Sequence, residues 1–183
     1  MIVAVPKEIY PGERRVALVP AGIPPLIKAG IQVHIESGAG DAAGYPDSAY
    51  LEKKAQIFPD RDALFDRANL ILQVRALGAN PIHGRADLER LGERQTVIGL
   101  CDPLGEPRAV ADLAATGANV FALELIPRIT RAQSMDVLSS MATVAGYKAV
   151  LLAANHLPKM YPMMMTAAGN IAAGKKFFNC GGR

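Results

Sequence analysis

Five short apolar runs recur along the first part of the chain, and segments with helical or turn character separate them. The runs cover residues 2–5, 31–36, 70–74, 96–100 and 120–123. Their apolar character is nearly continuous, as in strands that are buried on both faces. Strands that alternate with helices predict a parallel sheet between two helical layers. The sequence therefore predicts a three-layer α/β domain of the flavodoxin-like or Rossmann-like kind, with about five parallel strands.

Four segments between these runs have apolar residues three and four positions apart, which predicts helices. They cover residues 21–29, 48–55, 61–68 and 106–116. The first is followed by Gly30 and the last by Gly117. Glycine is favoured at this position because it readily adopts the left-handed conformation that ends a helix. Each of these two helices is therefore expected to end just before its glycine.

The pattern changes at Ser134, where an apolar stripe begins that runs to Pro158. Its members are Met135, Leu138, Met141, Val144, Ala145, Val150 and Leu152. Asp136 would lie in the first helical turn, where the helix dipole favours an acid. The sequence predicts one long connecting helix over residues 134–158, and then a linker and the start of a strand over residues 159–183.

Composition excludes several classes of protein. The formal net charge of +3 comes from 20 basic and 17 acidic residues that are interleaved along the chain, so no nucleic-acid partner is expected. Cys101 and Cys180 have neither metal-ligand nor disulfide-framework spacing, and no metal site is predicted. The histidines His34, His83 and His156 lack partners and are expected to be structural. The chain has no basic segment before its first apolar run, and no window is expected to reach the ~18 apolar residues that a spanning helix needs, which predicts a cytoplasmic protein without direct membrane insertion.

Two arginines follow predicted strands. Arg15 lies in the polar loop after the first strand, and Arg75 ends the third. In open α/β sheets, ligands bind outside the carboxyl ends of the strands, so either guanidinium could contact an anion or a substrate carboxylate. The alternatives are a solvated loop, in which Glu8 or Glu13 pairs with an arginine, and a simple charge at a strand end.

The densest polar stretch covers residues 128–140, between the last predicted strand and the long helix. Arginines, an amide, an acid and hydroxyls meet there at a helix N-terminus, whose free N–H groups favour anions and carboxamides. The alternative is a capped helix start, with Ser134 as N-cap and Asp136 in the first turn. That alternative leaves three side chains unassigned, namely Arg128, Arg131 and Gln133.

The opening of the chain resembles the N-terminal domain family of alanine dehydrogenases and pyridine nucleotide transhydrogenases. The resemblance is carried by residues 5–8 and 13–20 and by the turn at residues 37–40, and it extends over about residues 1–170. It implies an α/β domain over residues 1–133 whose long helix leads to a second, NAD-binding domain. Only a truncated start of that domain is expected within residues 159–183, so the second nucleotide domain is expected to be missing.

Further along, residues 128–140 and 145–150 resemble the transhydrogenase alpha-subunit branch of this family. In that branch the first stretch holds the nicotinamide ring of NAD(H) against the NADP(H) of a partner subunit. The resemblance implies cofactor-binding roles for seven residues: Arg128, Ile129, Thr130, Arg131, Gln133, Asp136 and Ser139. It requires no catalytic acid or base.

The resemblance also implies a biological setting. It predicts hydride transfer between NADH and NADP⁺, coupled to proton translocation by membrane and NADP-binding partner subunits. The chain is expected to form a homodimer, to lie in the cytoplasm or at the inner membrane through those partners, and to be inactive alone.

Two alternatives remain. One is a non-catalytic dimerisation or regulatory module, and the other is an alanine-dehydrogenase-like oxidoreductase. Alanine dehydrogenases bind pyruvate with a lysine at the end of the third strand and a histidine near the end of the next. Arg75 stands in place of that lysine, and residues 100–102, Leu-Cys-Asp, contain no histidine. Amino-acid oxidation is therefore disfavoured.

We expect the chain to show no NAD-dependent oxidation of L-alanine, because neither pyruvate-binding side chain is present. The measurement is the absorbance of NADH formed from NAD⁺ and L-alanine, with a known alanine dehydrogenase as the positive control. Alanine-dependent NADH formation above a buffer blank would contradict the branch assignment.

Overall fold

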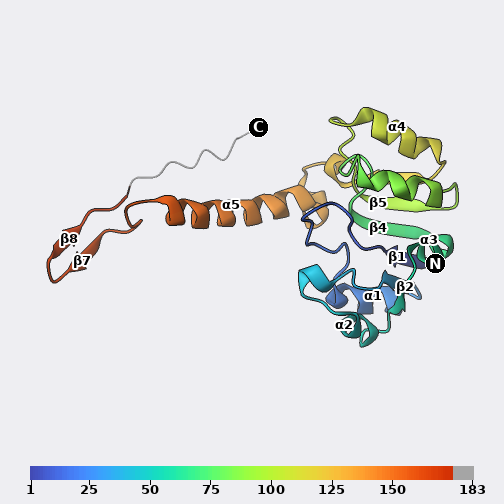
Figure 1. Cartoon of the computed structure of the whole chain (residues 1–183), viewed down its shortest axis with the longest axis horizontal. Helices are drawn as coiled ribbons and strands as arrows, with labels where there is room; N and C mark the ends of the chain where they lie inside the picture. The colour runs from blue at the N-terminus through green and yellow to red at the C-terminus, as the bar shows by residue number, and fades with distance from the viewer. Residues whose placement is uncertain (175–183) are drawn as a thin grey trace. The chain divides into compact units, whose positions relative to one another are not determined.

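Six parallel strands form one sheet in the order β3-β2-β1-β4-β5-β6 (Figure 1). They are β1 (Ile2–Val5), β2 (Gln32–Glu36), β3 (Gln56–Phe58), β4 (Leu70–Arg75), β5 (Thr96–Leu100) and β6 (Asn119–Ala122). This is the Rossmann strand order, in which the direction of winding reverses between β1 and β4. The predicted α/β fold is confirmed, and of its two variants the Rossmann order is the one observed.

The structure, a computed structural model, describes residues 1–174. The predicted start of a strand in the NAD-binding domain falls partly on residues 175–183, outside the described residues. The chain divides into two compact units, Met1–Pro127 and Arg128–Arg183.

The helices of the first unit bury apolar side chains against both faces of the sheet. They are α1 (Ile23–Lys28), α2 (Asp47–Leu51), α3 (Arg61–Arg67) and α4 (Pro107–Ala115), with short 3-10 helices η1 (Pro20–Gly22), η2 (Asp41–Ala43), η3 (His83–Arg90) and η4 (Leu123–Leu125). Successive residues of a strand point to opposite faces. Accordingly, Ala4 packs in the cluster that contains Phe65 of α3, whereas Val5 packs with Ile23 of α1 and Tyr50 of α2.

Strand β3 was not predicted from the sequence. It has three residues, too few to show a period, and its pairing with β2 decides its structure. The predicted helix over residues 48–55 is correspondingly short, because α2 ends at Leu51 and Lys54 adopts a left-handed conformation with φ of 67°. This turn brings the chain into β3 at the edge of the sheet.

The second unit contains the 3-10 helix η5 (Thr130–Met135), the long helix α5 (Val137–His156) and an antiparallel hairpin of β7 (Met164–Thr166) and β8 (Gly169–Ile171). The predicted long helix is present, but its predicted start is wrong. Asp136, not Ser134, is the N-cap, because the Asp136 carboxylate accepts the Ser139 N–H while Ser134 lies within η5. The hairpin replaces part of the predicted linker.

Helix α5 has 20 residues, and none is buried. The predicted apolar stripe is therefore not a buried face within residues 1–174, and large apolar side chains such as Val144, Tyr147 and Leu151 are exposed. Its length and a mean hydropathy of 1.5 make it the one helix among the described residues that could cross a membrane, whereas the sequence predicted no segment of that kind. These two properties assign no span on their own, because the core helix of a soluble protein shares them.

A buried histidine lies near the edge of the sheet. The ring of His34, in β2, stacks on Phe58 of β3 with 4.5 Å between centroids. Neither ring nitrogen has a hydrogen-bond partner among residues 1–174. Burial lowers the pKa of His34, and the nearby positive charge of Arg67 lowers it further. Protonation therefore opposes folding at this position.

We expect acid to destabilise the fold through His34. Because the folded-state pKa lies below the ordinary value of 6.5, the unfolded chain binds the proton first, so stability falls as the pH drops below 6.5. His34→Leu should reduce the dependence of the free energy of unfolding on pH below 6.5, whereas His83→Gln, a change at an exposed histidine, should not. Urea unfolding across this pH range measures the effect, and equal slopes for all three proteins would contradict it.

Candidate functional site

Arg61, at the start of α3, joins several segments at the carboxyl edge of the sheet. Its Nε and Nη2 donate to the two carboxylate oxygens of Asp87 at 2.8 and 2.7 Å. Its Nη1 donates to Glu36 at 2.7 Å and to the carbonyl of Lys7 at 2.9 Å. Gln73 of β4 also donates to Asp87, at 3.0 Å. The ends of β1, β2 and β4 are thereby held together where a Rossmann-order sheet binds its ligands.

Glu8 extends the sheet beyond the end of β1. Strand β1 pairs with β4 only at Val3 and Ala4. Further along, the Glu8 carboxylate accepts the N–H groups of Val74 at 2.6 Å and Arg75 at 3.1 Å. Burial raises the pKa of Glu8, against the opposing effect of these two hydrogen bonds. The backbone donors that a ligand could have used at this edge are therefore already occupied.

The structure brings Arg15 and Arg75 together around Glu13. Arg15 binds both Glu13 carboxylate oxygens, through Nε at 2.7 Å and Nη2 at 2.6 Å, and Arg75 Nε binds one of them at 2.9 Å. The side chain of Glu13 is 6% exposed, whereas those of Arg15 and Arg75 are 34% and 32% exposed. The hydrogen bonds from Arg15, followed by that from Arg75, lower the pKa of Glu13 to about 2. The pairing that the sequence left open is thus present.

A β-turn directs Glu13 into this cluster. The Glu13 N–H donates to the carbonyl of Tyr10 at 3.0 Å, with Pro11 and Gly12 at the two central positions. Gly12 has φ of 79°, the left-handed conformation that the third position of a type II turn requires. The ring of Tyr10 lies against Arg75, with 4.2 Å from the guanidinium carbon to the ring centroid. The turn therefore supplies both an acid and an aromatic ring to the arginines.

A second polar site lies in the second unit, at the junction of η5 and α5. A shallow pocket of about 320 Å³ is lined by Arg128, Ile129, Thr130, Gln133, Asp136 and Ser139. These are six of the seven residues for which the sequence suggested cofactor binding, and Arg131 does not line the pocket. The pocket combines a cation, an amide, a carboxylate and hydroxyls. Such a set can bind a small planar group that has both donors and acceptors.

Asp136 organises this pocket. Its carboxylate accepts the Ser139 N–H at 3.0 Å and the Ser139 hydroxyl at 2.6 Å. The hydrogen bond from the Ser139 hydroxyl is the main reason that the pKa of Asp136 is lowered, and the charge of Arg128 contributes. The ionised carboxylate fixes the Ser139 hydroxyl and begins α5 at the same time.

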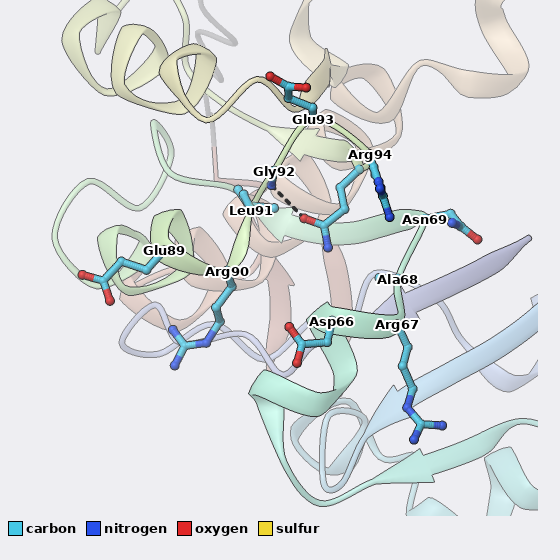
Figure 2. Close-up of a pocket in the computed structure, with 11 residues that line it drawn as sticks. Asp66, Arg67, Ala68, Asn69, Glu89, Arg90, Leu91, Gly92, Glu93 and Arg94 are labelled. Atoms are coloured by element: carbon cyan, nitrogen blue, oxygen red, sulfur yellow. Dashed lines mark hydrogen bonds between the residues drawn. The ribbon is translucent and has the colours of Figure 1, made fainter.

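Another depression of the first unit lies at the opposite, amino edge of the sheet (Figure 2). It measures about 590 Å³ and is lined by residues 66–69 and 89–95. Figure 2 shows the side chains of Arg67, Glu89 and Glu93 pointing away from one another. The Gln95 amide is satisfied by the Gly92 N–H and the Phe65 carbonyl. Because its charges do not converge, this depression is not a candidate site.

Cys101 lies directly after β5, within residues 100–102, where the sequence has no histidine. Its side chain is buried, and burial raises the pKa of the thiol to about 12. The N–H groups of Cys101 and Asp102 both donate to Glu124, at 2.7 and 2.6 Å. A buried, protonated thiol does not move protons at neutral pH.

Sequence reasoning missed Arg61, Glu36 and Asp87 as members of the carboxyl edge. No motif connects them, since Asp87 lies 26 residues after Arg61. The residues of the η5–α5 pocket were found because they are contiguous in the chain.

Comparison with known proteins gives a consistent result. Residues 4–145 match the family model described as "Alanine dehydrogenase/PNT, N-terminal domain". The chain is 39% identical over 175 residues to the NAD(P) transhydrogenase subunit alpha of Cereibacter sphaeroides, covering 96% of this chain and 32% of that protein. The solved transhydrogenase from Sinorhizobium meliloti aligns with a TM-score of 0.84 at 40% identity, over 94% of this chain and 50% of that one.

A solved L-alanine dehydrogenase is also similar, with a TM-score of 0.74 and 27% identity over 85% of this chain and 40% of that one. The chain thus spans between a third and a half of the length of these proteins.

We expect Glu13→Gln to reduce the loss of stability in acid. The folded-state pKa of Glu13 is lowered from 4.5 to about 2, so its ion pairs stabilise the fold above pH 4.5, and this contribution is lost as the pH falls from 4.5 through 2. The variant should be less stable than wild type near neutral pH and should approach it in acid. Urea unfolding near neutral pH and in acid measures the free energy of unfolding for both expectations.

Asp112→Asn is the matched control, because Asp112 pairs with Arg85 on the surface and the change in charge is the same. If the free energies of unfolding of wild type and Glu13→Gln change equally with pH below 4.5, the ion pairs of Glu13 do not stabilise the fold.

Proposed function

The chain belongs to the alanine dehydrogenase/PNT N-terminal domain family, and from this we propose that it acts as the N-terminal domain of a transhydrogenase alpha subunit. Its site is the pocket at the junction of η5 and α5, which receives the nicotinamide ring of NAD(H). The observation that carries the proposal is that five polar side chains able to bind a carboxamide line this one pocket together with Ile129. The greater identity to transhydrogenases, 39% and 40%, than to the solved alanine dehydrogenase, 27%, supports the same branch.

The donors and acceptors of the pocket fit the carboxamide of a nicotinamide ring. A carboxamide has an NH₂ that donates and an oxygen that accepts. The Asp136 carboxylate keeps lone pairs free beside its bonds to Ser139 and can accept from the NH₂. Arg128 and the Gln133 amide can donate to the oxygen. When bound, the nicotinamide supplies the hydride chemistry.

The residues of the pocket then act by position. Hydride transfer requires the two rings to be held close together, and fixing their orientation accounts for much of the rate. Asp136 is fixed by its role as the N-cap of α5, so groups bound to it are held by a rigid helix start. No residue of the pocket has to give or take a proton.

We propose that the chain works with partner subunits at a membrane. NADP(H) would be bound by a partner subunit, and membrane subunits would couple hydride transfer to proton translocation. The chain would lie on the cytoplasmic side, peripheral to the inner membrane through those subunits. Hydride transfer would require these subunits, because one of them would bind the second nucleotide, NADP(H).

We also propose that the chain forms a homodimer. In support, α5 has no buried residue, and the Met163, Met164 and Met165 side chains around β7 are exposed. The same surface supports the second candidate function, a dimerisation module without hydride chemistry. The two candidates differ in whether changes to the pocket affect hydride transfer.

In a complete alpha subunit assembled with its partner subunits, we expect Gln133→Ala and Asp136→Asn each to lower hydride transfer tenfold or more. The affinity for NADH should change little, because most contacts to the dinucleotide would come from the nucleotide domain. Hydride transfer between NADH and NADP⁺ and NADH binding are measured on the same preparations. Ser134→Ala, in η5 but outside the pocket, is the matched control.

If both variants transfer hydride at the wild-type rate and unfold at the wild-type temperature, the pocket does not hold the ring. A dimer that forms normally in such variants would then favour the dimerisation module.

A further inference from the structure

An imidazole without hydrogen-bond partners is buried beside the edge strand β3. His34 is 2% exposed, and neither of its ring nitrogens has a partner among residues 1–174. We propose that His34 is an acid-sensitive contact for β3: the neutral ring holds this strand in place, and the protonated ring releases it in a local opening that leaves the rest of the sheet folded. The proposal is independent of the nicotinamide pocket, which is made of residues of the second unit.

His34 contacts β3 through its side chain and its backbone. Its ring stacks on the Phe58 ring, with 4.5 Å between centroids and 27° between the ring planes. His34 is also paired with Gln56 in the parallel register of β2 and β3. The guanidinium carbon of Arg67 lies 5.6 Å from the centroid of the same Phe58 ring. A neutral imidazole can pack here without placing a second positive charge near Arg67.

Protonation changes the hydrogen-bonding needs of this ring. A neutral imidazole has one N–H donor and one acceptor, whereas an imidazolium has two donors and a full charge. Within the described residues no group accepts a hydrogen bond from either nitrogen of His34. A buried charge without a partner costs much more free energy than a buried neutral polar group. The protonated ring is therefore stabilised mainly by reaching water, which requires β3 to move away.

The charges around His34 do not compensate for protonation. Strands β1 and β3 contain no charged residue, and α1 packs against the opposite face of β2. The charged residues on the remaining neighbours, β2 and α3, are Glu36, Arg61, Asp62, Asp66 and Arg67. Glu36 is already bound by Arg61, and Asp62 by Arg90. Asp66 is exposed. Burial lowers the pKa of His34, and the charge of Arg67 lowers it further.

Strand β3 is the part of the sheet that can open by itself. It has three residues and pairs only with β2, whereas β2 is also held by four register pairs with β1. Lys54, in its left-handed conformation, precedes the strand, and residues 59–60 separate it from α3. Short elements with few contacts open at a lower free energy than the core. Release of β3 therefore does not require unfolding of the other strands.

Acid favours the open form by linkage. In the open form the ring lies in water and has its ordinary pKa of 6.5, whereas burial lowers the pKa in the closed form. The open form therefore binds the proton first as the pH falls below 6.5. The opening equilibrium then rises by up to about tenfold per pH unit, until the closed form is protonated as well. Opening of β3 is thus rare at neutral pH and more frequent in mild acid.

Hydrogen exchange of two backbone amides tests this opening. The Ser37 N–H donates to the Phe58 carbonyl at 2.8 Å and reports on β3, and the Ala76 N–H donates to the Leu100 carbonyl at 2.8 Å and reports on β4 and β5. After correction for the intrinsic exchange rate, opening at Ser37 should rise about threefold or more between pH 7 and pH 5. Low urea should accelerate exchange at Ala76 but not at Ser37, because only global unfolding exposes a large surface.

Variants assign the proton to His34. In His34→Leu, opening at Ser37 should be independent of pH over the same range. His83→Gln is the matched control, because His83 is exposed and lies outside the sheet, and it should show the wild-type increase. If His34→Leu fails to fold, His34→Gln, which keeps a polar side chain that does not titrate, should give the same result.

Three results would overturn the proposal. In the first, Ser37 and Ala76 exchange with the same protection and the same dependence on urea, which makes β3 part of one cooperative unit. In the second, opening at Ser37 does not change between pH 7 and pH 5. In the third, the increase persists in a folded His34 variant, which assigns the proton to another group.

Discussion

The bidentate pair between Arg61 and Asp87 is the interaction on which the carboxyl edge of the sheet depends. Both side chains are largely buried, and each also binds a second strand end, through Glu36 in β2 and Gln73 in β4. Removing one member of such a pair leaves an uncompensated charge in the interior, at a cost of about 3–5 kcal/mol. The pair therefore stabilises the fold and also holds the ends of β1, β2 and β4 next to one another.

The direction of winding reverses between β1 and β4, and two glutamates of the chain occupy hydrogen-bond donors at this point. Glu8 binds the free backbone of β4, and Glu13 binds the two arginines that flank the same edge. A Rossmann-order sheet offers this position to nucleotides when a glycine-rich turn follows its first strand. Here residues 6–16 follow it with proline, glutamates and arginines instead, so the fold keeps the strand order without the phosphate site. The polar pocket for which we propose nicotinamide binding is made of residues of the second unit.

Sequence reasoning succeeded where contacts are local. Six of the seven residues predicted to act together line one pocket at the junction of η5 and α5, because residues such as Arg128, Gln133 and Asp136 are neighbours in the chain and a helix start brings such neighbours together; their role in cofactor binding stays a prediction. The alternative interpretation had Ser134 as the N-cap, whereas the structure has Asp136 there, because both residue types can cap a helix and the sequence does not show at which one the helix begins. Sequence reasoning missed β3, because three residues have no period and only the pairing with β2 makes them a strand.

The sequence by itself determined the α/β class, because buried strands and amphipathic helices leave a periodic apolar pattern that is local in the chain. Only the tertiary structure decided the strand order, the pairing of Arg61 with Asp87 and the capture of Glu13 by Arg15 and Arg75. Glu8 meets Val74 across 66 residues, and Glu13 meets Arg75 across 62. An ion pair is selected by which charges remain close once the apolar core has packed. No spacing in the sequence encodes that selection, since an arginine near a strand end can pair with any acid that the fold brings within reach.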